Sequence, residues 1–495
     1  MATAAFGGPE IPGLVGNQSS QESPQKLDEG ALHYFDAIVM AVAGSAPAYS
    51  ISSTTAVIVL AVGLASPASL LWCGIPMLGI AIAYHQLNQM GANAGAAYAW
   101  VGRVLHPYLG YLAGWCLVIS AVIFMVEASL PAGQATVSLV SAHASNQAVW
   151  YTSVGAVWFL VMAYFVARGV RITANAQWVM SCIEVLLLLV FVVLGFLHSH
   201  KVEHFSISWF GFSQFGSTGK FASGALVAAF YYWGWDVSSN LCEETADSEK
   251  ASGSGGIIGV IICLVIFELF MLVINMDLSH KAATNGTNPL QELGAVVGGG
   301  AGGKLMVLAL MLSTIATLET TLIQGTRSLF SMSRERTLPK ALGRLREGWN
   351  TPAFATGVIV VISLVLFVAS NFIGNVDKIL VDGESAIDLQ ICIYYSLAGL
   401  AAVVGFRRYA TRSVKNLVFM FLLPLLGSAF MLYVFIEALA TKYVTGLSVW
   451  LGIGGMVIAV VPITFYALKG SPYLHQKPTL GRADIATELP ASGTL

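Results

Sequence analysis

Charged residues are scarce in this sequence. Asp, Glu, Lys and Arg make up 10% of its 495 residues, and hydrophobic residues make up 56%, whereas a soluble domain carries roughly 25% charged residues. With a net charge of −2 and no basic block, the sequence lacks the charge pattern of a nucleic-acid-binding protein. These shortages argue against a set of soluble domains and predict one large membrane domain.

Cysteine and histidine are also few, at six and nine residues. The cysteines fall within or at the edges of apolar segments without paired spacing, so we expect small buried hydrophobes and neither a disulfide framework nor a metal site. No His/Cys/Asp spacing suggests a metal centre or a nucleophile with its base, and we expect a protein that is not an enzyme and needs no cofactor. Residues 1–30 are polar, which predicts a disordered tail and no cleaved signal peptide.

Long apolar runs are what the sequence has in abundance. A bilayer core requires about 20 apolar residues per helix. Twelve segments meet this requirement, at 34–62, 67–89, 108–135, 147–167, 174–198, 219–241, 255–278, 304–330, 353–371, 387–405, 415–438 and 447–468. The sequence therefore predicts an all-α polytopic membrane protein with twelve transmembrane helices.

The loops between these runs differ in their content of basic residues. With the N-terminus placed in the cytoplasm, 18 of the 24 Lys and Arg residues fall on the cytoplasmic side, including Arg327 and the group from Arg334 to Arg346. Cytoplasmic loops of membrane proteins carry such an excess. The distribution predicts a multi-pass protein of the plasma membrane with both termini in the cytoplasm.

Two of the runs are interrupted in the middle. Residues 44–47 (GSAP) interrupt the first, and their proline removes a backbone donor; residues 233–236 (WGWD) interrupt the sixth. Broken helices within a membrane are tolerated only where they are buried in protein or line a cavity. Interruptions at matching positions of two halves indicate an inverted-repeat transporter with its site at the midplane. For residues 44–47 alone, an ordinary kink is the alternative.

Acidic side chains within the apolar runs are a second signal. A charged residue at the centre of a span costs about 2.5–3.5 kcal/mol on insertion scales and marks a functional site by default. Because the sequence places no Lys or Arg at comparable depth, these acids must be protonated, solvated, or matched by a proton, sodium or an amine. Candidates for ion coupling are Glu127, Glu184, Asp236 and Glu319, whereas Glu268 and Glu437, near span ends, are expected to be structural.

Two other groups of side chains accompany these acids. Hydroxyls at positions 313, 314, 317, 320 and 321 surround Glu319, and they either bond to their own helix backbone or offer oxygen ligands to sodium. The aromatic residues at 230–235 either pack or present ring faces to a cationic amine, a contact worth about 0.5–2 kcal/mol. Their position at the helix break favours the second interpretation.

Three parts of the chain together resemble amino acid–polyamine–organocation (APC) permeases. They correspond to the loop into the third helix of that family (93–101 and 107–115), to its sixth helix and acidic exit (230–236 and 243–245), and to the end of its eighth helix (327–335, closing on Leu338 and Pro339). The likeness covers about residues 30–470.

The resemblance implies the leucine-transporter (LeuT) fold, in which two inverted repeats of five helices are followed by two extra helices. On this chain it implies a first repeat over 31–200, a second over 201–410 and the extra helices over 411–470. Disordered cytoplasmic tails would then occupy 1–30 and 471–495.

The resemblance also implies where a substrate binds. In such permeases, amides at the start of the second half of helix 1 hold a carboxylate, and carbonyls at the ends of the first halves of helices 1 and 6 receive an amine. Helix N-termini attract anions and carbonyl ends attract cations on physical grounds as well. The implied substrate-binding residues are Ala43, Gly44, Ser45, Ala46, Ala48 and Tyr49 on helix 1, and Phe230, Tyr231, Trp233 and Gly234 on helix 6.

The sequence departs from the family pattern at two positions. Pro47 has no N–H to offer a carboxylate, which leaves room for an amine without one. Many proton-coupled relatives carry a lysine in helix 5 whose charge stands in for sodium, whereas the matching run here, 175–188, places Glu184 there. The coupling ion is a proton or sodium, with the proton as the first expectation.

These features predict secondary active import of an amino acid or related amine by alternating access, in a bacterial inner membrane. The alternatives are a sodium-coupled symporter of a nucleobase-like solute, a polyamine permease or exchanger and, from other classes, a membrane enzyme, a channel or a transport-inactive sensor. The expected partners are the small-molecule substrate and the lipid bilayer, and no oligomeric state follows from the sequence.

Overall fold

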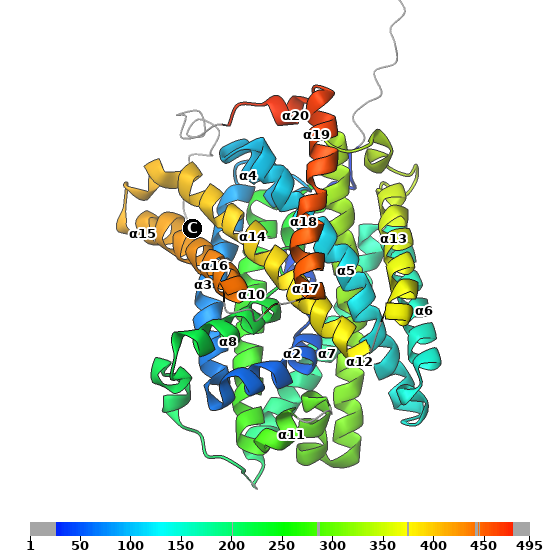
Figure 1. Cartoon of the computed structure of the whole chain (residues 1–495), viewed down its shortest axis with the longest axis vertical. Helices are drawn as coiled ribbons and strands as arrows, with labels where there is room; N and C mark the ends of the chain where they lie inside the picture. The colour runs from blue at the N-terminus through cyan, green and yellow to red at the C-terminus, as the bar shows by residue number, and fades with distance from the viewer. Residues whose placement is uncertain are drawn as a thin grey trace, which may run out of the picture.

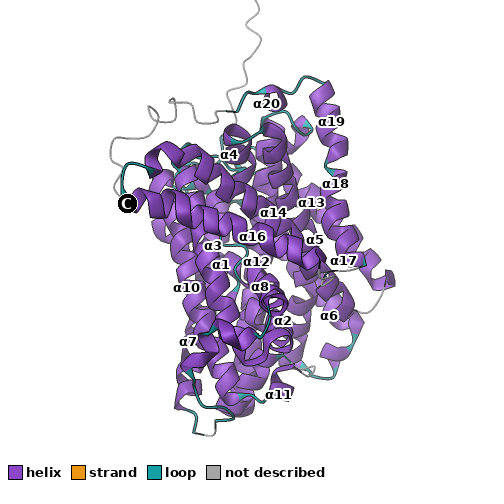
Figure 2. Ribbon diagram, turned by 60° about the vertical axis from the view of Figure 1, so that its left-hand side comes forward, coloured by secondary structure: helices purple, strands orange, loops and turns teal. Residues whose placement is uncertain are grey.

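The protein is a bundle of helices. Its computed structural model describes residues 26–478 apart from 200, 285–287, 374–375, 441–443 and 445. No strand occurs among these residues (Figure 2). Most of the long helices run along the long axis of the molecule, and α14 (Val376–Ala410) crosses them obliquely (Figure 1).

Nine stretches of the described chain are long and apolar enough to cross a membrane, so the prediction of an all-α, multi-pass membrane protein is confirmed. The first stretch, 34–88, runs through both of the first two predicted spans. It contains α1 (Tyr34–Ser45), α2 (Pro47–Val62) and α3 (Ser66–Asn88). Two further predicted spans, the sixth and the ninth, are occupied by α8 (Thr218–Tyr231) and α13 (Ala353–Ile373).

The remaining predicted spans also coincide with helices. They are formed by α5 (Pro107–Val140), α6 (Ala148–Arg168), α7 (Val170–Leu197), α10 (Ser248–Asp277), α12 (Pro289–Arg334), α14, the pair α15 (Val414–Leu417) and α16 (Leu423–Ala440), and the run from α17 (Leu447–Val449) through α18 (Gly455–Ile458) to α19 (Val460–Leu468).

The helices form an inner and an outer group. The inner group is α5, α12 and α14. In the most apolar segment of each of these helices, 72–83% of the residues are buried, and α5 packs against both of the others. The outer group includes α6, α16 and α19. Only 17–28% of the residues in their apolar segments are buried, and large side chains such as Val157, Leu432 and Val461 are exposed. A helix that is apolar all round is stable with one side facing lipid, so these exposed faces indicate the lipid-facing surface.

Both predicted interruptions are present. Ala46 is in the left-handed region (φ 46°) between α1 and α2. The chain also leaves the helix between α8 and α9 (Val237–Asn240), where Gly234 has φ 95°. The first break is shorter than predicted, because Pro47 opens α2, a position at which its missing N–H costs no hydrogen bond.

Two sequence-based assignments are corrected by the structure. Arg327, assigned to a cytoplasmic loop, lies within α12 and is fully buried, where its guanidinium bonds to both carboxylate oxygens of Glu244 at 3.0 and 2.8 Å. Arg327 is therefore buried in the protein and does not lie in a loop. Cys182, expected to be buried, is exposed on α7, and all six cysteines are free.

Parts of both predicted tails are packed against the bundle. Residues 1–25 and 479–495 lie outside the described residues. Leu27 is buried, and α20 (Pro472–His475) buries Tyr473 at the end of the molecule that also carries α4 (Figure 1).

Candidate binding site at two broken helices

The two helix breaks touch each other through glycine backbones. A Cβ atom added to Gly44 would clash with the carbonyl oxygen of Gly234, and one added to Gly234 would clash with that of Gly44. Because Gly234 also has φ 95°, it combines close approach with a conformation that other residues rarely adopt. The two breaks are thus in direct backbone contact.

The start of α2 is capped by side chains from two other helices. Pro47 has no N–H, and the next N–H, that of Ala48, donates to Oε1 of Glu184 on α7 at 2.9 Å. The N–H of Tyr49 donates to Oγ of Ser313 on α12 at 3.1 Å. A helix start leaves N–H groups without intrahelical partners, and here the partners are a buried carboxylate and a hydroxyl.

The end of α1 is bonded to α12. The hydroxyl of Thr317 donates to the carbonyl oxygen of Gly44 at 3.1 Å, and that of Ser50 donates to the carbonyl oxygen of Ser45 at 2.9 Å. The Ser45 hydroxyl itself has no hydrogen-bond partner although it is buried. Two hydroxyls of the predicted cluster on α12, at 313 and 317, thus face the first break.

The sixth-helix break is held by a network around Asp236. Its Oδ1 accepts hydrogen bonds from Gln324 at 2.9 Å and from the hydroxyl of Tyr395 at 3.0 Å, and its Oδ2 accepts one from Tyr394 at 3.3 Å. The indole N–H of Trp233 donates to the Tyr394 hydroxyl at 2.6 Å. The network therefore links the break to α12 and α14.

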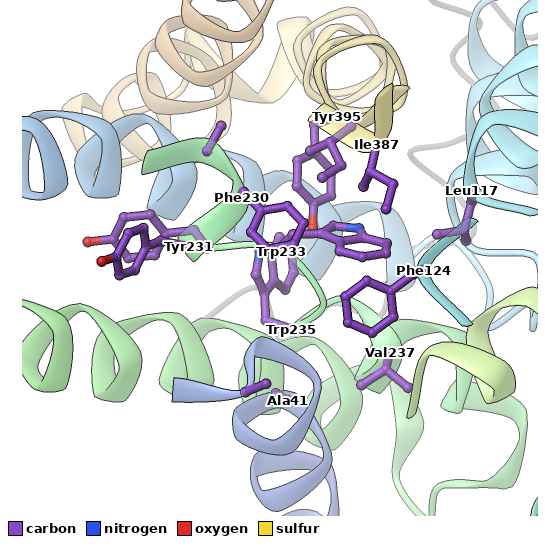
Figure 3. Packing of buried hydrophobic residues seen from close by; sticks show 14 of the residues in the cluster. Ala41, Leu117, Phe124, Phe230, Tyr231, Trp233, Trp235, Val237, Ile387 and Tyr395 are labelled. Carbon is purple, nitrogen blue, oxygen red and sulfur yellow. The ribbon is translucent and has the colours of Figure 1, made fainter. Parts of the chain in front are cut away.

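Four aromatic rings gather beside the breaks, and Figure 3 shows three of them, Phe124, Phe230 and Trp233, close together. Tyr49 completes the group. Neighbouring ring centroids lie 5.2–6.5 Å apart. Aromatic faces attract cations, so rings of this kind next to the helix breaks are suited to contact with an amine. We call these four residues the ring cluster.

The other acidic candidates are also buried and lack ion pairs in the part of the chain that the structure describes. Glu127 accepts a hydrogen bond from the Tyr49 hydroxyl at 3.0 Å, and Glu319 accepts one from Gln177 at 2.6 Å. One oxygen of each of Glu127, Glu184 and Glu319 has no hydrogen-bond partner. An unpaired buried carboxylate is costly as an anion, so each favours a proton, a bound water or a mobile cation as its partner.

All ten predicted substrate-binding residues are buried, but they do not all face the ring cluster. They are Ala43, Gly44, Ser45, Ala46, Ala48, Tyr49, Phe230, Tyr231, Trp233 and Gly234. Tyr231 points away, because its hydroxyl lies 2.6 Å from that of Thr55 and its ring packs on Phe267 (Figure 3). Of the two acids expected to be structural, Glu268 is buried with both oxygens unpartnered, whereas Glu437 is partly exposed.

Two acids near the site were missed by the sequence analysis. Asp388 and Glu384 on α14 lie close enough to Glu127 to interact electrostatically. A Cβ added to Gly383 would lie 3.6 Å from Oε2 of Glu127, so α5 and α14 approach closely here. A signal existed, because Asp388 falls inside the predicted span 387–405. The polar partners Gln177, Gln324, Tyr394 and Tyr395 carried no sequence signal that distinguishes them from packing residues.

One cavity lies away from the two helix breaks. It has a volume of about 390 Å³ and is lined by residues that include Asn93, Arg103, Glu335 and Tyr473. None of the predicted site residues lines it. Burial raises the pKa of the Glu335 carboxyl, against the opposing effect of Arg334.

Comparison with known proteins gives a consistent set of matches. The profile of a family described as amino acid permease matches residues 32–468. The chain is 25% identical over 410 residues to the low-affinity putrescine importer PlaP of Escherichia coli. The aligned region covers 79% of this chain and 84% of the relative. It is 24% identical over 306 residues to the methylthioribose transporter of Bacillus subtilis (59% and 65%) and 26% identical over 260 residues to the serine/threonine exchanger SteT of the same organism (50% and 55%).

Proposed function

Because this chain belongs to the amino acid permease family, we propose that it is a secondary active transporter that imports a small amine-bearing solute, an amino acid or a related amine, by alternating access. The family is one of transporters and not of enzymes. The observation that carries the proposal is the backbone contact between Gly44 and Gly234 at two broken helices. Broken helices place carbonyl and amide ends at the centre of a membrane protein, where transporters of this kind bind their solutes.

The proposed architecture is the LeuT fold with twelve transmembrane helices. Three observations support this number. Nine stretches of the described chain are long and apolar enough to span, and one of them, 34–88, divides into two at Ser66. The sixth and ninth predicted spans are supplied by α8 and α13. Repeats over 31–200 and 201–410 would each begin with a broken helix, and 411–470 would supply the two extra helices. Both termini would be cytoplasmic, and the bacterial relatives support an inner-membrane location.

The proposed coupling ion is a proton. Glu184, Glu127 and Glu319 each have an oxygen without a hydrogen-bond partner, and a carboxylate that takes up a proton on one side and releases it on the other can carry charge across the membrane. Each charge moved across 100 mV contributes about 2.3 kcal/mol. Sodium is the alternative, because the hydroxyls of Ser313 and Thr317 face the first break and each keeps a lone pair that could ligate the ion.

The test is uptake by the purified full-length protein in proteoliposomes. Labelled diamines, amino acids, methylthioribose and a nucleobase would each be offered under an imposed pH gradient, an imposed sodium gradient, or no gradient, with protein-free liposomes as the control. We expect saturable accumulation of at least one amine under the pH gradient without sodium. Accumulation that requires sodium would overturn the coupling proposal, and accumulation of the nucleobase alone would overturn the solute class.

A further inference from the structure

The helix end that would bind a solute carboxylate already holds a carboxylate of the protein. Pro47 opens α2 without an N–H, and the N–H of Ala48 donates to Glu184 at 2.9 Å. The N–H of Tyr49 donates to Ser313 at 3.1 Å. The first three positions of α2 therefore offer no free N–H to an anion, and a solute carboxylate would have to displace the carboxylate of Glu184. A solute without a carboxylate would leave these hydrogen bonds intact.

The hydroxyl end of Tyr49 faces a group of acids that we call the acid cluster: Glu127 on α5 with Glu384 and Asp388 on α14. Glu127 is 2% exposed and accepts the Tyr49 hydroxyl with Oε1, but its Oε2 has no partner. Asp388 is 4% exposed, and its Oδ1 also has no partner. Within the described residues, no Lys, Arg or His forms an ion pair with these three acids.

Buried carboxylate oxygens without partners are rare in folded proteins, because each loses its hydration without a replacement. An ammonium group supplies what they lack, since it carries the opposite charge and three N–H donors. Asp236, by contrast, already receives hydrogen bonds from three side chains. Oxygens without partners also occur on Glu184, Glu319 and Glu268, but the acid cluster is the group that a hydrogen bond joins to the ring cluster, through Tyr49.

The ring cluster lies next to the acid cluster. Tyr49 belongs to both groups, since its ring packs 5.8 Å from Phe124 and its hydroxyl reaches Glu127. A short methylene chain would be stabilised by contact with these rings, and an ammonium group by the faces of Trp233 and Phe230. The site thus combines a blocked carboxylate position, an apolar middle and an acidic end.

We propose that the solute is a diamine without a carboxylate, and that the acid cluster binds its second ammonium group while the carbonyl ends at the two breaks receive the first. This inference rests on the proposed transport function and specifies its solute. It makes Glu127 and Asp388 residues that determine specificity.

Four probes separate the two features of the proposed solute, its second amine and its lack of a carboxylate. They are 1,4-diaminobutane, ornithine (the same chain with a carboxylate), butylamine (the same chain with one amine) and 2-aminopentanoate (one amine and a carboxylate). Each would compete with labelled 1,4-diaminobutane for counterflow in proteoliposomes without an ion gradient. Since a hydrogen bond to a charged group contributes roughly tenfold or more in affinity, we expect both ornithine and butylamine to compete about tenfold less well than 1,4-diaminobutane.

Variants of the acid cluster test where the second ammonium binds. Glu127→Gln and Asp388→Asn should weaken competition by 1,4-diaminobutane about tenfold and leave that by butylamine unchanged, so retained butylamine competition also shows that the variants are folded. The matched control is Glu268→Gln, which changes a buried acid of α10 whose oxygens also lack partners and should alter neither value. Because label uptake itself could weaken, the same competition would be read by thermal stabilisation of the detergent-purified variants.

The outcomes are distinguishable. Ornithine or 2-aminopentanoate competing as well as 1,4-diaminobutane would overturn the diamine assignment while leaving the transport function intact. If Glu127→Gln weakened competition by butylamine and by 1,4-diaminobutane equally, the acid cluster would serve folding. If it changed only the uptake driven by a pH gradient, the acid cluster would serve proton movement. Either result would overturn the proposed role. No transport of any amine by the wild type would overturn the proposed function itself.

Discussion

Gly44 and Gly234 meet backbone to backbone, and neither position has room for a methyl group, because a Cβ on one would clash with the carbonyl oxygen of the other. The contact joins residues from two helices that are far apart in the sequence at the points where both are broken. It holds the carbonyl end of α1 against the turn between α8 and α9, and the hydrogen bond from Thr317 to Gly44 ties that point to α12. Three helices are thus fixed at one position.

Gly44→Ala should therefore abolish transport and lower stability. Gly44 is helical with an ordinary φ, so the substitution introduces only the clash, and overpacking of a close-packed interior costs typically 1–3 kcal/mol. Counterflow and thermal unfolding in detergent would measure the two effects. The control is Gly216→Ala, at φ 67° with no atom near the added Cβ, which strains the backbone without a clash and should leave transport intact. Wild-type transport by Gly44→Ala would show that the contact yields at little cost.

A buried ion pair provides a second prediction. The side chains of Arg327 and Glu244 are 1% and 0% exposed. Arg327→Met should destabilise the protein by about 3–5 kcal/mol, because it leaves the Glu244 carboxylate buried without its partner. Denaturant titration in detergent would measure this loss. In the double variant with Glu244→Leu most of the stability should return, and a double variant as unstable as the single one would show that packing of the arginine stem, and not its charge, matters.

The positions of the helices could be predicted from the sequence because the bilayer imposes a length and an apolar composition on each span. The last predicted span, 447–468, has the same bounds as the run from α17 to α19. The breaks could be predicted too, since Pro47 and Gly234 are residues that interrupt helices. The composition of a span does not determine which other helices it packs against. The sequence therefore named Glu184 as a candidate but gave no sign that it caps Ala48.

The candidate site was incomplete for the same reason. Glu384 lies just before the apolar run of α14, where a charged residue is typical of a loop, yet helix packing brings it near Glu127. Arg327 was misplaced because a basic residue near a span end normally faces the cytoplasm, and only the structure supplies its buried partner. Partners across helices depend on rotation and crossing of the helices, which are set by packing.

The proposed orientation can be tested with single cysteines. Lys340 and Lys281 are both exposed and lie on opposite sides in the proposed topology, so Lys340→Cys should react with an impermeant thiol reagent only in inside-out vesicles, and Lys281→Cys only in intact cells. The exposed Cys182 would first be replaced by serine. Ser333 is unsuitable for labelling, since it is buried and donates to the carbonyl of Pro339. The reverse labelling pattern would invert the topology.

Glu184 joins the broken first helix to α7, and its two oxygens are in different situations. Oε1 accepts the Ala48 N–H, while Oε2 has no partner. A glutamine at this position keeps an oxygen for the Ala48 N–H and so preserves the cap of α2. It cannot bind or release a proton. The substitution therefore separates a structural role from a coupling role.

We expect Glu184→Gln to abolish accumulation of substrate against a gradient while sparing exchange of substrate across the membrane. Accumulation needs a group that takes up a proton on one side and loses it on the other, whereas exchange needs only the binding site and its alternating exposure. Uptake driven by an imposed pH gradient and counterflow would be compared in the same proteoliposomes. Glu268→Gln, a change of the same kind on α10, should retain both activities. If Glu184→Gln accumulates substrate like the wild type at every pH, the residue serves only to cap α2, and the proton must be carried by another acid.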